Sequence, residues 1–462
     1  GAMSSMESTC HTTDEDQKVP QRQYAPADSR LPTKTPLLGL GCSSFSTFFS
    51  SPEEESLTVD TISKDHIAVQ GWVETIRHAV LNRGINLLDT APWYGHGISE
   101  ITVGYALDTL LTDDDEHDDD GGNSAPLNHL RRKRTGSLPR SRLIVNTKVG
   151  RYDANPLHQF DFSYDTTIQS IQRSLERMNC DYIDVIQLHD PEFAPSISLL
   201  KQETIPALVE CKKRGWAKAI GLTGYPLEVQ HQILVECQDL SGDGVVFDQS
   251  LVYCHNNLHD MSLYCDPCFP SLKDELEGQE DDGNITYTQF CQKSSIHLMA
   301  AAPLSMGLLT TAGPPPWHPA GHALKEGCAA AVKMCDFKGV NISSLALLYS
   351  LSQPEVGCTL LGMKDVREVD VAADLAIRFC GINFDVVGGN AGANNPFRRS
   401  NNDGILDKVL TQKEKEALAL LMDENGGPFP KVKSNGEYRW NGKEEARKFW
   451  ALVAELKKEG DL

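Results

Sequence analysis

Four side chains of different chemistry stand at or just after the ends of short apolar runs in this sequence. Asp89 ends the run that begins at Ile85, and Tyr94 follows five residues later. Lys148 ends the run RLIVNTK, and His189 ends the run DYIDVIQLH. A carboxylate, a phenol, an ammonium and an imidazole form a set that can move a proton to or from a substrate oxygen. The spacing therefore predicts an acid–base site.

The chemistry of the four groups is coherent. A free tyrosine has a pKa of about 10, which is too high for easy proton exchange at neutral pH. A neighbouring ammonium favours the phenolate, so Lys148 is expected to lower the pKa of Tyr94. Asp89 is expected to keep Lys148 charged and in place, and His189 to orient the substrate oxygen. Oxidation of a carbinol would also need a hydride carrier.

Each of these residues alone has an ordinary structural explanation. Asp89 could cap a turn, Tyr94 could pack in the core, Lys148 could form a structural ion pair, and His189 could be a buried core histidine. Separate explanations do not account for all four at the ends of consecutive apolar runs. We therefore favour the functional interpretation.

Eight apolar runs recur along the chain, at about residues 37, 85, 142, 181, 217, 244, 296 and 356. Their lack of alternation is typical of strands buried on both faces, and the segments between them show helical periodicity. Strand–helix alternation of this kind predicts a parallel sheet. We expect an α/β fold, a closed (β/α)₈ TIM barrel. An open doubly wound sheet is the alternative, weakened by the absence of G-x-G-x-x-G after the first run.

In a (β/α)₈ barrel the functional groups gather at the carboxyl ends of the strands, where the four residues would lie. The expected organisation is a disordered N-terminal segment, a barrel with two inserts, a Gly/Asn-rich linker and a helical C-terminal extension packed beneath or across the barrel. These parts are residues 1–35, 36–380 with inserts 111–141 and 270–284, 381–404 and 405–462.

Composition excludes several classes of partner. The net charge of −21 is unsuited to binding nucleic acid over a broad surface, and no apolar stretch reaches the length of a membrane span. Thirteen cysteines without a regular spacing indicate reduced thiols, and the polar N-terminus lacks a secretory signal, so we expect a cytoplasmic protein. The oligomeric state is left open.

Two patterns could bind a metal, but we expect no metal site. Cys265 and Cys268 form a single CxxC pair, which is weak evidence for zinc. His318 and His322 have a suitable spacing, yet the prolines around them oppose the helix that such a pair requires.

The stretches GINLLDTAPWYG, IVNTKVGRY, LERMNCDYIDVIQLHD and IPALVECKKRGWAKAIGLTGYP together resemble the aldo-keto reductase superfamily. The resemblance covers about residues 36–375 without the inserts. It implies that Asp89, Tyr94, Lys148 and His189 are the catalytic tetrad, with Tyr94 as general acid/base. The stretches HDPEF, LTGYPLE, YCHNN and APLSMGLLT are most similar to the L-galactose dehydrogenase branch of plants.

The resemblance implies NAD as the hydride acceptor, with NADP left open. Glu368 stands where NADP-preferring relatives carry arginine, and its charge would repel a 2′-phosphate. Trp93 and His255 are candidate sugar contacts. The candidate cofactor contacts lie on the loops after four strands: Gly41, Cys42, Thr223, Gly224, Ser305, Gly307, Leu308, Gly362, Met363, Lys364 and Glu368.

The expected activity is oxidation of L-galactose or a related aldose at C1 to the lactone. One alternative is an NADPH-dependent reductase of aldehydes or ketones from a specialised metabolite. The other is a barrel without activity that serves as a binding or regulatory subunit. The intact tetrad disfavours this last alternative.

Overall fold

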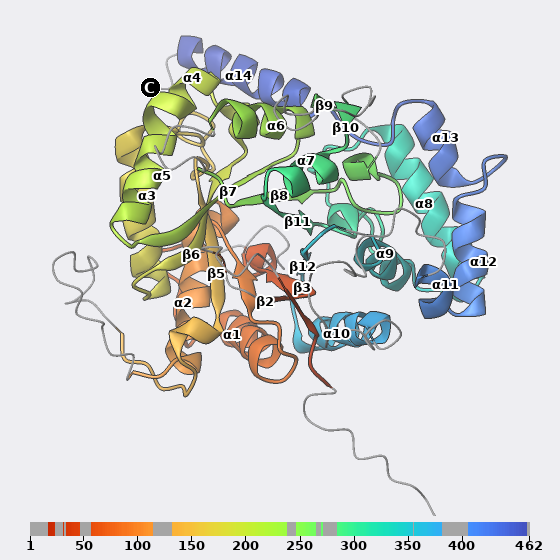
Figure 1. The fold of residues 1–462 in the computed structure, drawn as a ribbon, viewed down its shortest axis with the longest axis horizontal. Coiled ribbons are helices and arrows are strands. Elements are labelled where there is room, and N and C mark those ends of the chain that lie inside the picture. Colours follow the sequence, from red (N-terminus) through yellow and green to blue (C-terminus); the bar gives the residue numbers. More distant parts are fainter. Residues whose placement is uncertain are drawn as a thin grey trace, which may run out of the picture.

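Eight parallel strands close into a barrel at the centre of the molecule (Figure 1). The computed structural model describes residues 17–23, 31, 34–46, 57–113, 132–237, 246–264, 269–270, 284–353, 355–380 and 405–459. The strands follow one another around the barrel in chain order, which confirms the predicted TIM barrel. They are β3 (Leu38–Gly41), β4 (Leu87–Asp89), β5 (Ile144–Val149), β6 (Ile183–His189), β7 (Ala217–Gly224), β8 (Gln249–Tyr253), β11 (His297–Ala301) and β12 (Cys358–Gly362).

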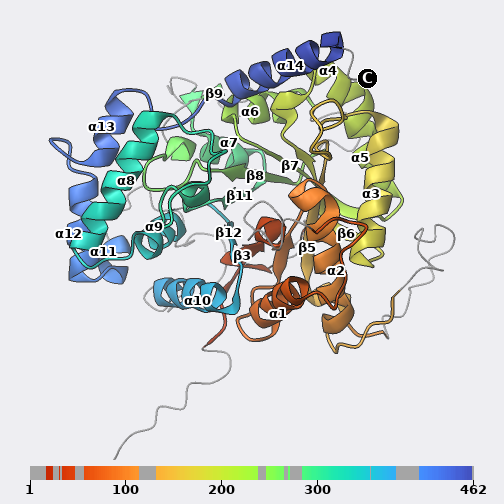
Figure 2. The same cartoon turned by 180° about the vertical axis from the view of Figure 1, so that it is seen from behind.

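A ring of helices covers the outside of the barrel (Figures 1 and 2). The helices that alternate with the strands are α1 (Ile67–Leu81), α2 (Ile98–Leu110), α3 (Tyr164–Met178), α5 (Ile205–Lys213), α6 (Leu227–Glu236), α7 (Tyr287–Lys293), α9 (Ile342–Leu351) and α10 (Val366–Cys380). Helices α4 (Ile197–Leu199) and α8 (His322–Phe337) are additional elements. Of the helices described, none is long and apolar enough to cross a membrane.

Local sequence explains where these elements begin and end. Helix α3 starts after Ser163, whose hydroxyl accepts from the backbone N–H of Thr166, and it ends at Asn179 in the left-handed conformation. Strand β6 is buried at every position because the barrel covers one face and helices cover the other.

The barrel interior is layered along each strand. Leu87, Ile144 and Val185 belong to the apolar cluster that fills its lower part. Side chains two residues further along a strand face the same side, so polar Asp89 and Gln187 form the next layer above this cluster. The sequence thus seals the bottom of the barrel and places polar groups toward the carboxyl ends of the strands.

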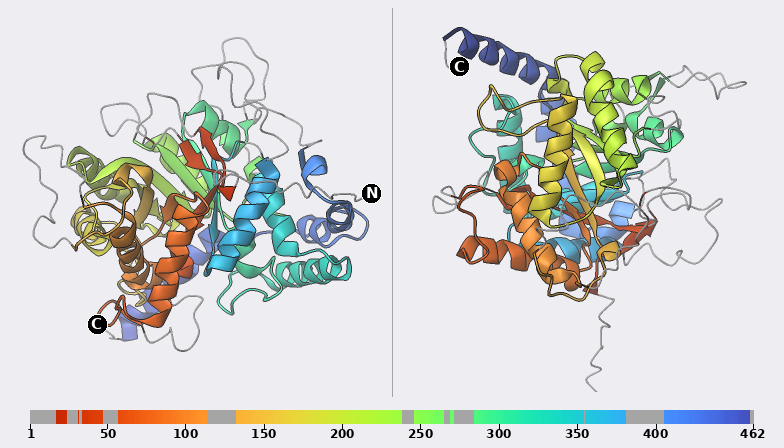
Figure 3. Two further views of the ribbon diagram at one scale, coloured as in Figure 1. Left: turned by 90° about the horizontal axis from the view of Figure 1, so that it is seen from below. Right: turned by 90° about the vertical axis from the view of Figure 1, so that its left-hand side faces the viewer.

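The C-terminal extension is helical, as expected, and it covers two parts of the barrel. Helices α11 (Ile405–Val409), α12 (Gln412–Leu421) and α13 (Pro428–Ser434) lie beside α8 and α9. Helix α14 (Gly442–Glu459) instead crosses to the loop after β6 and runs along the edge of the molecule, with its end reaching past its neighbours (Figure 3).

The expectation of an N-terminal segment without structure was wrong for its described part. Strand β1 (Gln21–Gln23) pairs antiparallel with β2 (Lys34–Pro36), which leads into β3. Backbone pairing between short polar strands leaves no apolar periodicity in the sequence, so the pattern could not show it.

The inserts also differ from a plain solvated loop. Arg132 forms an ion pair with Asp108 at 2.6 Å, and buried Arg134 donates to the carbonyl of Asn179 at 3.1 Å. These arginines therefore hold the end of the 111–141 insert against the barrel. Strands β9 (Phe269–Pro270) and β10 (Asn284–Ile285) pair at the base of the second insert. The remaining insert residues and the predicted linker 381–404 lie outside the described ranges.

One buried ion pair ties the start of β5 to β6. Arg140 donates to Asp184 at 2.8 Å and to the carbonyl of Tyr182 at 3.1 Å, and Asp184 also accepts from the backbone N–H of Val145. Arg140 and Asp184 are 5% and 4% exposed. We expect Arg140→Ala to lower the free energy of unfolding by about 3 kcal/mol, because it removes the hydrogen-bonded cation of a buried carboxylate. Lys218, which is 46% exposed and 3.7 Å from Asp184, replaces that cation poorly.

Denaturant unfolding of the wild type and two variants checks this prediction. Arg447→Ala is the matched control, since the Arg447 side chain on α14 is 78% exposed and pairs with Glu444, three residues away. It should leave stability unchanged. Equal stability of the two variants would contradict the structural importance of the Arg140–Asp184 pair.

Candidate active site

The innermost pair of the predicted tetrad is an ion pair inside the barrel. Lys148 on β5 donates to Asp89 on β4, and it also donates to the carbonyl of Thr90 at 2.7 Å. Burial lowers the pKa of Lys148, but the charges of Asp89 and Tyr94 outweigh burial and hold that pKa above its ordinary value. The lysine is therefore a fixed positive charge at neutral pH.

Two glutamines extend this pair across the barrel. The second carboxylate oxygen of Asp89 accepts from Gln187 Nε2 at 2.7 Å, and Gln187 Oε1 accepts from Gln249 Nε2 at 3.3 Å. Gly221 leaves room for the side chain of Gln187, because a Cβ at position 221 would lie 2.8 Å from Gln187 Cγ. Both oxygens of Asp89 are thus held, and the carboxylate has a defined direction.

Tyr94 is carried to the mouth by a tight turn after β4. Its backbone N–H donates to the carbonyl of Ala91 at 3.1 Å, and the turn continues with positive φ angles at Gly95, His96 and Gly97. Glycine adopts such angles without steric cost, which explains two of these three positions. The turn then passes directly into α2.

The four predicted residues come together. Lys148 Nζ lies 4.7 Å from the ring centroid of Tyr94, and the ring of Tyr94 lies 6.2 Å from that of His189 at a steep angle. Tyr94 is partly exposed, whereas the other three residues are buried. The phenol is therefore the member of the group that a substrate can reach most directly.

The expected lowering of the pKa of Tyr94 was wrong in its net direction. Burial raises that pKa above its ordinary value, and the charge of Asp89 adds to this effect. Lys148 lowers the pKa through its charge and a hydrogen bond, as the sequence suggested, but by less. At neutral pH the phenol therefore carries its proton.

His189 is a neutral imidazole at physiological pH. Burial lowers its pKa to about 3, even though Asp190 opposes this shift. Its Nδ1 atom is buried without a hydrogen-bond partner. A neutral imidazole with an unsatisfied nitrogen, whose ring lies 6.2 Å from that of Tyr94, is suited to hydrogen-bonding a substrate oxygen.

Charged and aromatic groups that were not predicted line the mouth next to the tetrad. Arg151 forms an ion pair with Asp190 at 2.8 Å, and its guanidinium lies 3.9 Å from the ring centroid of Trp93. Glu192 accepts from the backbone N–H of Tyr225 at 3.1 Å, and burial together with the charge of Asp190 raises its pKa to about 8. Trp93 therefore lies beside Arg151 at the mouth, and its role as a substrate contact stays a prediction.

His255 has a different environment from the one expected. One ring nitrogen contacts Ser262 Oγ at 2.6 Å and the other contacts the carbonyl of Tyr225 at 2.5 Å. Its ring is 2% exposed and stacks beneath Tyr225. Both ring nitrogens contact other groups of the protein, which disfavours His255 as a sugar contact.

Two of the strand ends that were expected to hold a cofactor carry glycine and so present backbone without a side chain. Gly41 and Gly362 pair in adjacent strands, and a Cβ on Gly362 would meet nothing nearer than Gly41 O at 3.8 Å and Ser43 Oγ at 3.9 Å. Cys42 and Met363 are buried, so these two positions can offer mainly backbone to a ligand. The absence of a side chain at Gly41 and Gly362 is compatible with a flat group that approaches the backbone closely.

The other candidate cofactor loops are held in specific shapes. Ser305 and Gly307 have positive φ angles, and the Ser305 hydroxyl contacts His259 Nε2 at 2.8 Å. Leu308 is buried beneath this turn. Thr223 and Gly224 use their carbonyls to accept from the backbone N–H of Asp190 and from the Gln230 side chain, each at 2.8 Å.

The start of α10, expected at the adenosine end, carries charges of both signs. Glu368 Oε2 accepts from the backbone N–H of Lys364 at 2.9 Å, and Asp365 accepts from the backbone N–H of Glu368 at 3.0 Å. The Arg367 side chain turns toward Asp365 and is 90% exposed. Lys364 and Arg367 balance the charges of Asp365 and Glu368, so the net charge of this segment does not select between NAD and NADP.

Metal ligands are not gathered in the described part of the chain. No group of three or more His, Cys, Asp or Glu residues there could hold an ion. His318 is buried and contacts the carbonyl of Ser305 at 3.1 Å, whereas His322 is 86% exposed at the start of α8. The pair Cys265 and Cys268 lies outside the described residues.

Comparison with known proteins agrees with this geometry. The model of the aldo/keto reductase family matches residues 62–376. An L-galactose dehydrogenase of Arabidopsis thaliana is 35% identical over 304 residues, covering 66% of this chain and 77% of the relative. The chain belongs to the aldo/keto reductase family. It is therefore an NAD(P)-dependent oxidoreductase.

Two further relatives of this aldo/keto reductase are more distant. A D-arabinose 1-dehydrogenase of Saccharomyces cerevisiae is 28% identical over 339 residues, covering 73% of this chain and 82% of the relative. The solved structure of an aldo-keto reductase from Bacillus halodurans is 20% identical with a TM-score of 0.49, and it covers 77% of this chain and 90% of its own.

Sequence reasoning missed Gln187, Arg151 and Asp190. Gln187 stands two residues before His189, so strand periodicity places both on the interior face, and this signal could have identified it. Asp190 adjoins His189 and was visible in the same run. Arg151 and Trp93 lie on two different loops, so their contact cannot be predicted from the spacing of residues in the sequence.

The raised pKa of Tyr94 predicts opposite pH dependences for the two reaction directions. Oxidation needs the phenolate, whose fraction rises about tenfold per pH unit below its pKa, so the rate of oxidation should climb through the alkaline range. Reduction needs the protonated phenol and should stay level across neutral pH. Initial rates between about pH 6 and 10 test this. Oxidation that is already level from neutral pH would contradict the raised pKa.

The Gln187 contact predicts a loss of turnover without a loss of binding. Gln187→Leu leaves one oxygen of Asp89 unsupported and should lower kcat by about tenfold or more, with KM changed less than about twofold. Gln249→Leu removes only the outer link of the chain and serves as the graded control, with a smaller effect. Steady-state kinetics on folded variants measure both. A larger effect of Gln249→Leu than of Gln187→Leu would contradict the arrangement in which Gln249 supports Asp89 through Gln187.

Proposed function

We propose that this aldo/keto reductase oxidises an aldose at C1 to the lactone, with L-galactose or a related sugar as substrate and NAD as hydride acceptor. The placement of the Tyr94 phenol between Lys148 and His189 is the observation that carries the proposal. The L-galactose and D-arabinose dehydrogenases among its relatives support a sugar substrate.

The reaction removes the hydrogen of C1 as a hydride and the hydrogen of the C1 hydroxyl as a proton. Tyr94, as phenolate, takes the proton of the C1 hydroxyl, and Lys148 stabilises the phenolate by its fixed charge. His189 uses its unpartnered Nδ1 to orient the same oxygen. A bound nicotinamide supplies the acceptor for the C1 hydride. The C1–oxygen bond then becomes the carbonyl of the lactone.

The residues that would hold the nicotinamide dinucleotide lie at the carboxyl ends of the barrel strands and in the loops that follow them. Gly41 and Gly362 would let its ring end approach the backbone, with Thr223 and Gly224 opposite. The turn at Ser305, Gly307 and Leu308 would meet its pyrophosphate. Lys364 and Glu368 would border its adenosine, where the Glu368 carboxylate, held on the backbone N–H of Lys364, would repel a 2′-phosphate.

A second candidate is carbonyl reduction with NADPH, which one observation favours. The raised pKa of Tyr94 keeps the phenol protonated at neutral pH, and this is the form that donates a proton to a carbonyl oxygen. Direction and cofactor preference separate the two candidates.

Nicotinamide absorbance measured with a panel of aldoses tests the proposal, with NAD and NADP in both directions. Fast oxidation of L-galactose with NAD and slow oxidation with NADP is the expected result. Carbonyl reduction by NADPH without any aldose oxidation would favour the second candidate.

Tyr94→Phe checks the assignment of the acid/base. It should lower kcat by about 10²- to 10⁴-fold, because only the proton transfer is lost. Binding of the reduced nicotinamide, followed by its fluorescence, should change less than about twofold. Equal loss of both would mean that Tyr94 supports the cofactor site instead.

A further inference from the structure

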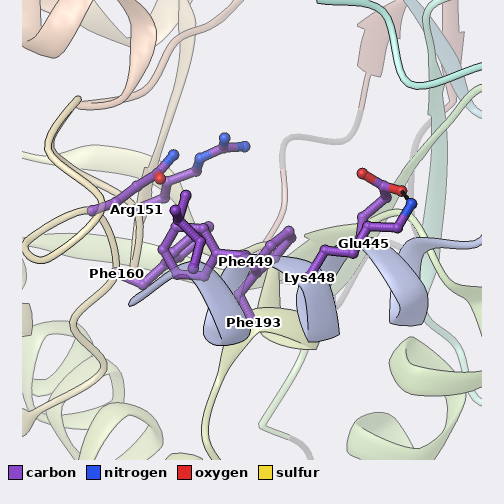
Figure 4. Close-up of a pocket in the computed structure, with 8 residues that line it drawn as sticks. Arg151, Phe160, Phe193, Glu445, Lys448 and Phe449 are labelled. Atoms are coloured by element: carbon purple, nitrogen blue, oxygen red, sulfur yellow. Dashed lines mark hydrogen bonds and ion pairs between the residues drawn. The ribbon is translucent and has the colours of Figure 1, made fainter. Parts of the chain in front are cut away.

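A pocket of about 310 Å³ lies between α14 and the loops that follow β5 and β6 (Figure 4). Phe160 and Phe193 from these loops, together with Phe449 and Leu452 from α14, form its apolar wall. Phe160 and Phe193 stack at 4.4 Å, and Phe449 meets both rings edge-on. The volume is at the lower end of the range of small-molecule sites and suits one side group of a ligand.

The pocket adjoins the reaction centre. Arg151 forms part of its lining and at the same time lies over the ring of Trp93, the residue before Tyr94. Arg151 is also paired with Asp190, which follows His189. A substrate held at the tetrad would therefore extend past Trp93 and Arg151 toward the phenylalanines.

The charges around the pocket are paired. Arg151 is neutralised by Asp190, and Lys448 on α14 contacts Glu445 at 2.9 Å (Figure 4). Aromatic walls with paired charges at the rim favour a neutral aromatic or branched apolar group over an anion. A free monosaccharide offers less apolar surface than an aromatic or branched apolar group and would cover these walls less completely.

Other contacts already attach α14 and its approach to the barrel. The ring of Trp440 stacks on Tyr225 at 4.3 Å, and the Trp450 indole donates to the carbonyl of Phe193 at 3.1 Å. Leu452 is not needed for this attachment and remains 44% exposed at the edge of the pocket. Helix α14 also lies beyond residues 62–376, where the family model matches.

We propose that this pocket binds a neutral aromatic or branched apolar substituent carried by the substrate away from C1. The inference rests on the proposed function and narrows its substrate class to aldoses that bear such a group. Helix α14 is then a specificity element of this chain, and Phe449 and Leu452 are its contacts.

The test compares L-galactose with its 6-O-benzyl ether in the full-length protein. For the wild type, kcat/KM should be about tenfold higher or more for the benzyl ether, because a hydrophobic pocket discriminates by about that factor. Phe449→Ala should remove about tenfold of kcat/KM for the benzyl ether and change the free sugar less than about twofold. Phe337→Ala on α8 is the matched control, since Phe337 is 89% exposed and lies outside the pocket lining.

A second variant guards against a loosened helix. Leu452→Trp fills the pocket from an exposed position, so it should reduce kcat/KM for the benzyl ether while the free sugar keeps its rate. Equal use of both sugars by the wild type, or equal losses on both in Phe449→Ala and Leu452→Trp, would overturn the inference while aldose oxidation still stands.

A measurement without turnover separates this inference from the proposed function. Saturation-transfer NMR should show the benzyl protons receiving magnetisation from the wild type and losing it in Leu452→Trp. If no aldose is oxidised but this contrast appears, the proposed function fails and the pocket remains an apolar group site. If the benzyl protons receive no magnetisation from the wild type, or receive as much from Leu452→Trp, the assignment of the pocket as a binding site is overturned.

Discussion

The buried ion pair between Lys148 and Asp89 is the constraint on which the site depends. Two charges in a barrel core are costly unless each is fully hydrogen-bonded, and here the ammonium meets Asp89 and the carbonyl of Thr90. The remaining oxygen of Asp89 is held by Gln187. Because these groups come from β4, β5 and β6, the pair is satisfied only when the three strands keep their register. The closed barrel and the geometry of the site therefore depend on the same hydrogen bonds.

Tyr94 shows how burial and charge compete in this site. Lys148 favours the phenolate, yet removal of water from the phenol acts more strongly in the opposite direction. The lysine therefore moderates an unfavourable shift rather than producing an acidic tyrosine. His189 undergoes the same desolvation and stays neutral, so the site holds one fixed cation, one protonated phenol and one neutral imidazole.

The mouth of the barrel combines elements that are distant in the sequence. Arg151 links the loops after β4, β5 and β6 through Trp93 and Asp190, and α14 adds aromatic side chains from the end of the chain. The barrel supplies the chemistry, while the appended helix adds an apolar surface beside it. Because the two roles lie on different segments, changes in the appended helix can alter which substrates are accepted while the reacting groups stay the same.

The sequence by itself determined the eight strands, the barrel and the four polar residues that meet at its mouth, because apolar runs and the polar groups at their ends are local signals. Gln187 was within its reach through strand periodicity. The net pKa of Tyr94 was not, since it depends on how much water the whole site excludes. The pairing of β1 with β2, the internal hydrogen bonds of His255 and the placement of Phe449 beside Phe160 were also decided only by the tertiary structure. Each is a contact between segments far apart in the chain, and such contacts leave no periodic pattern in the sequence.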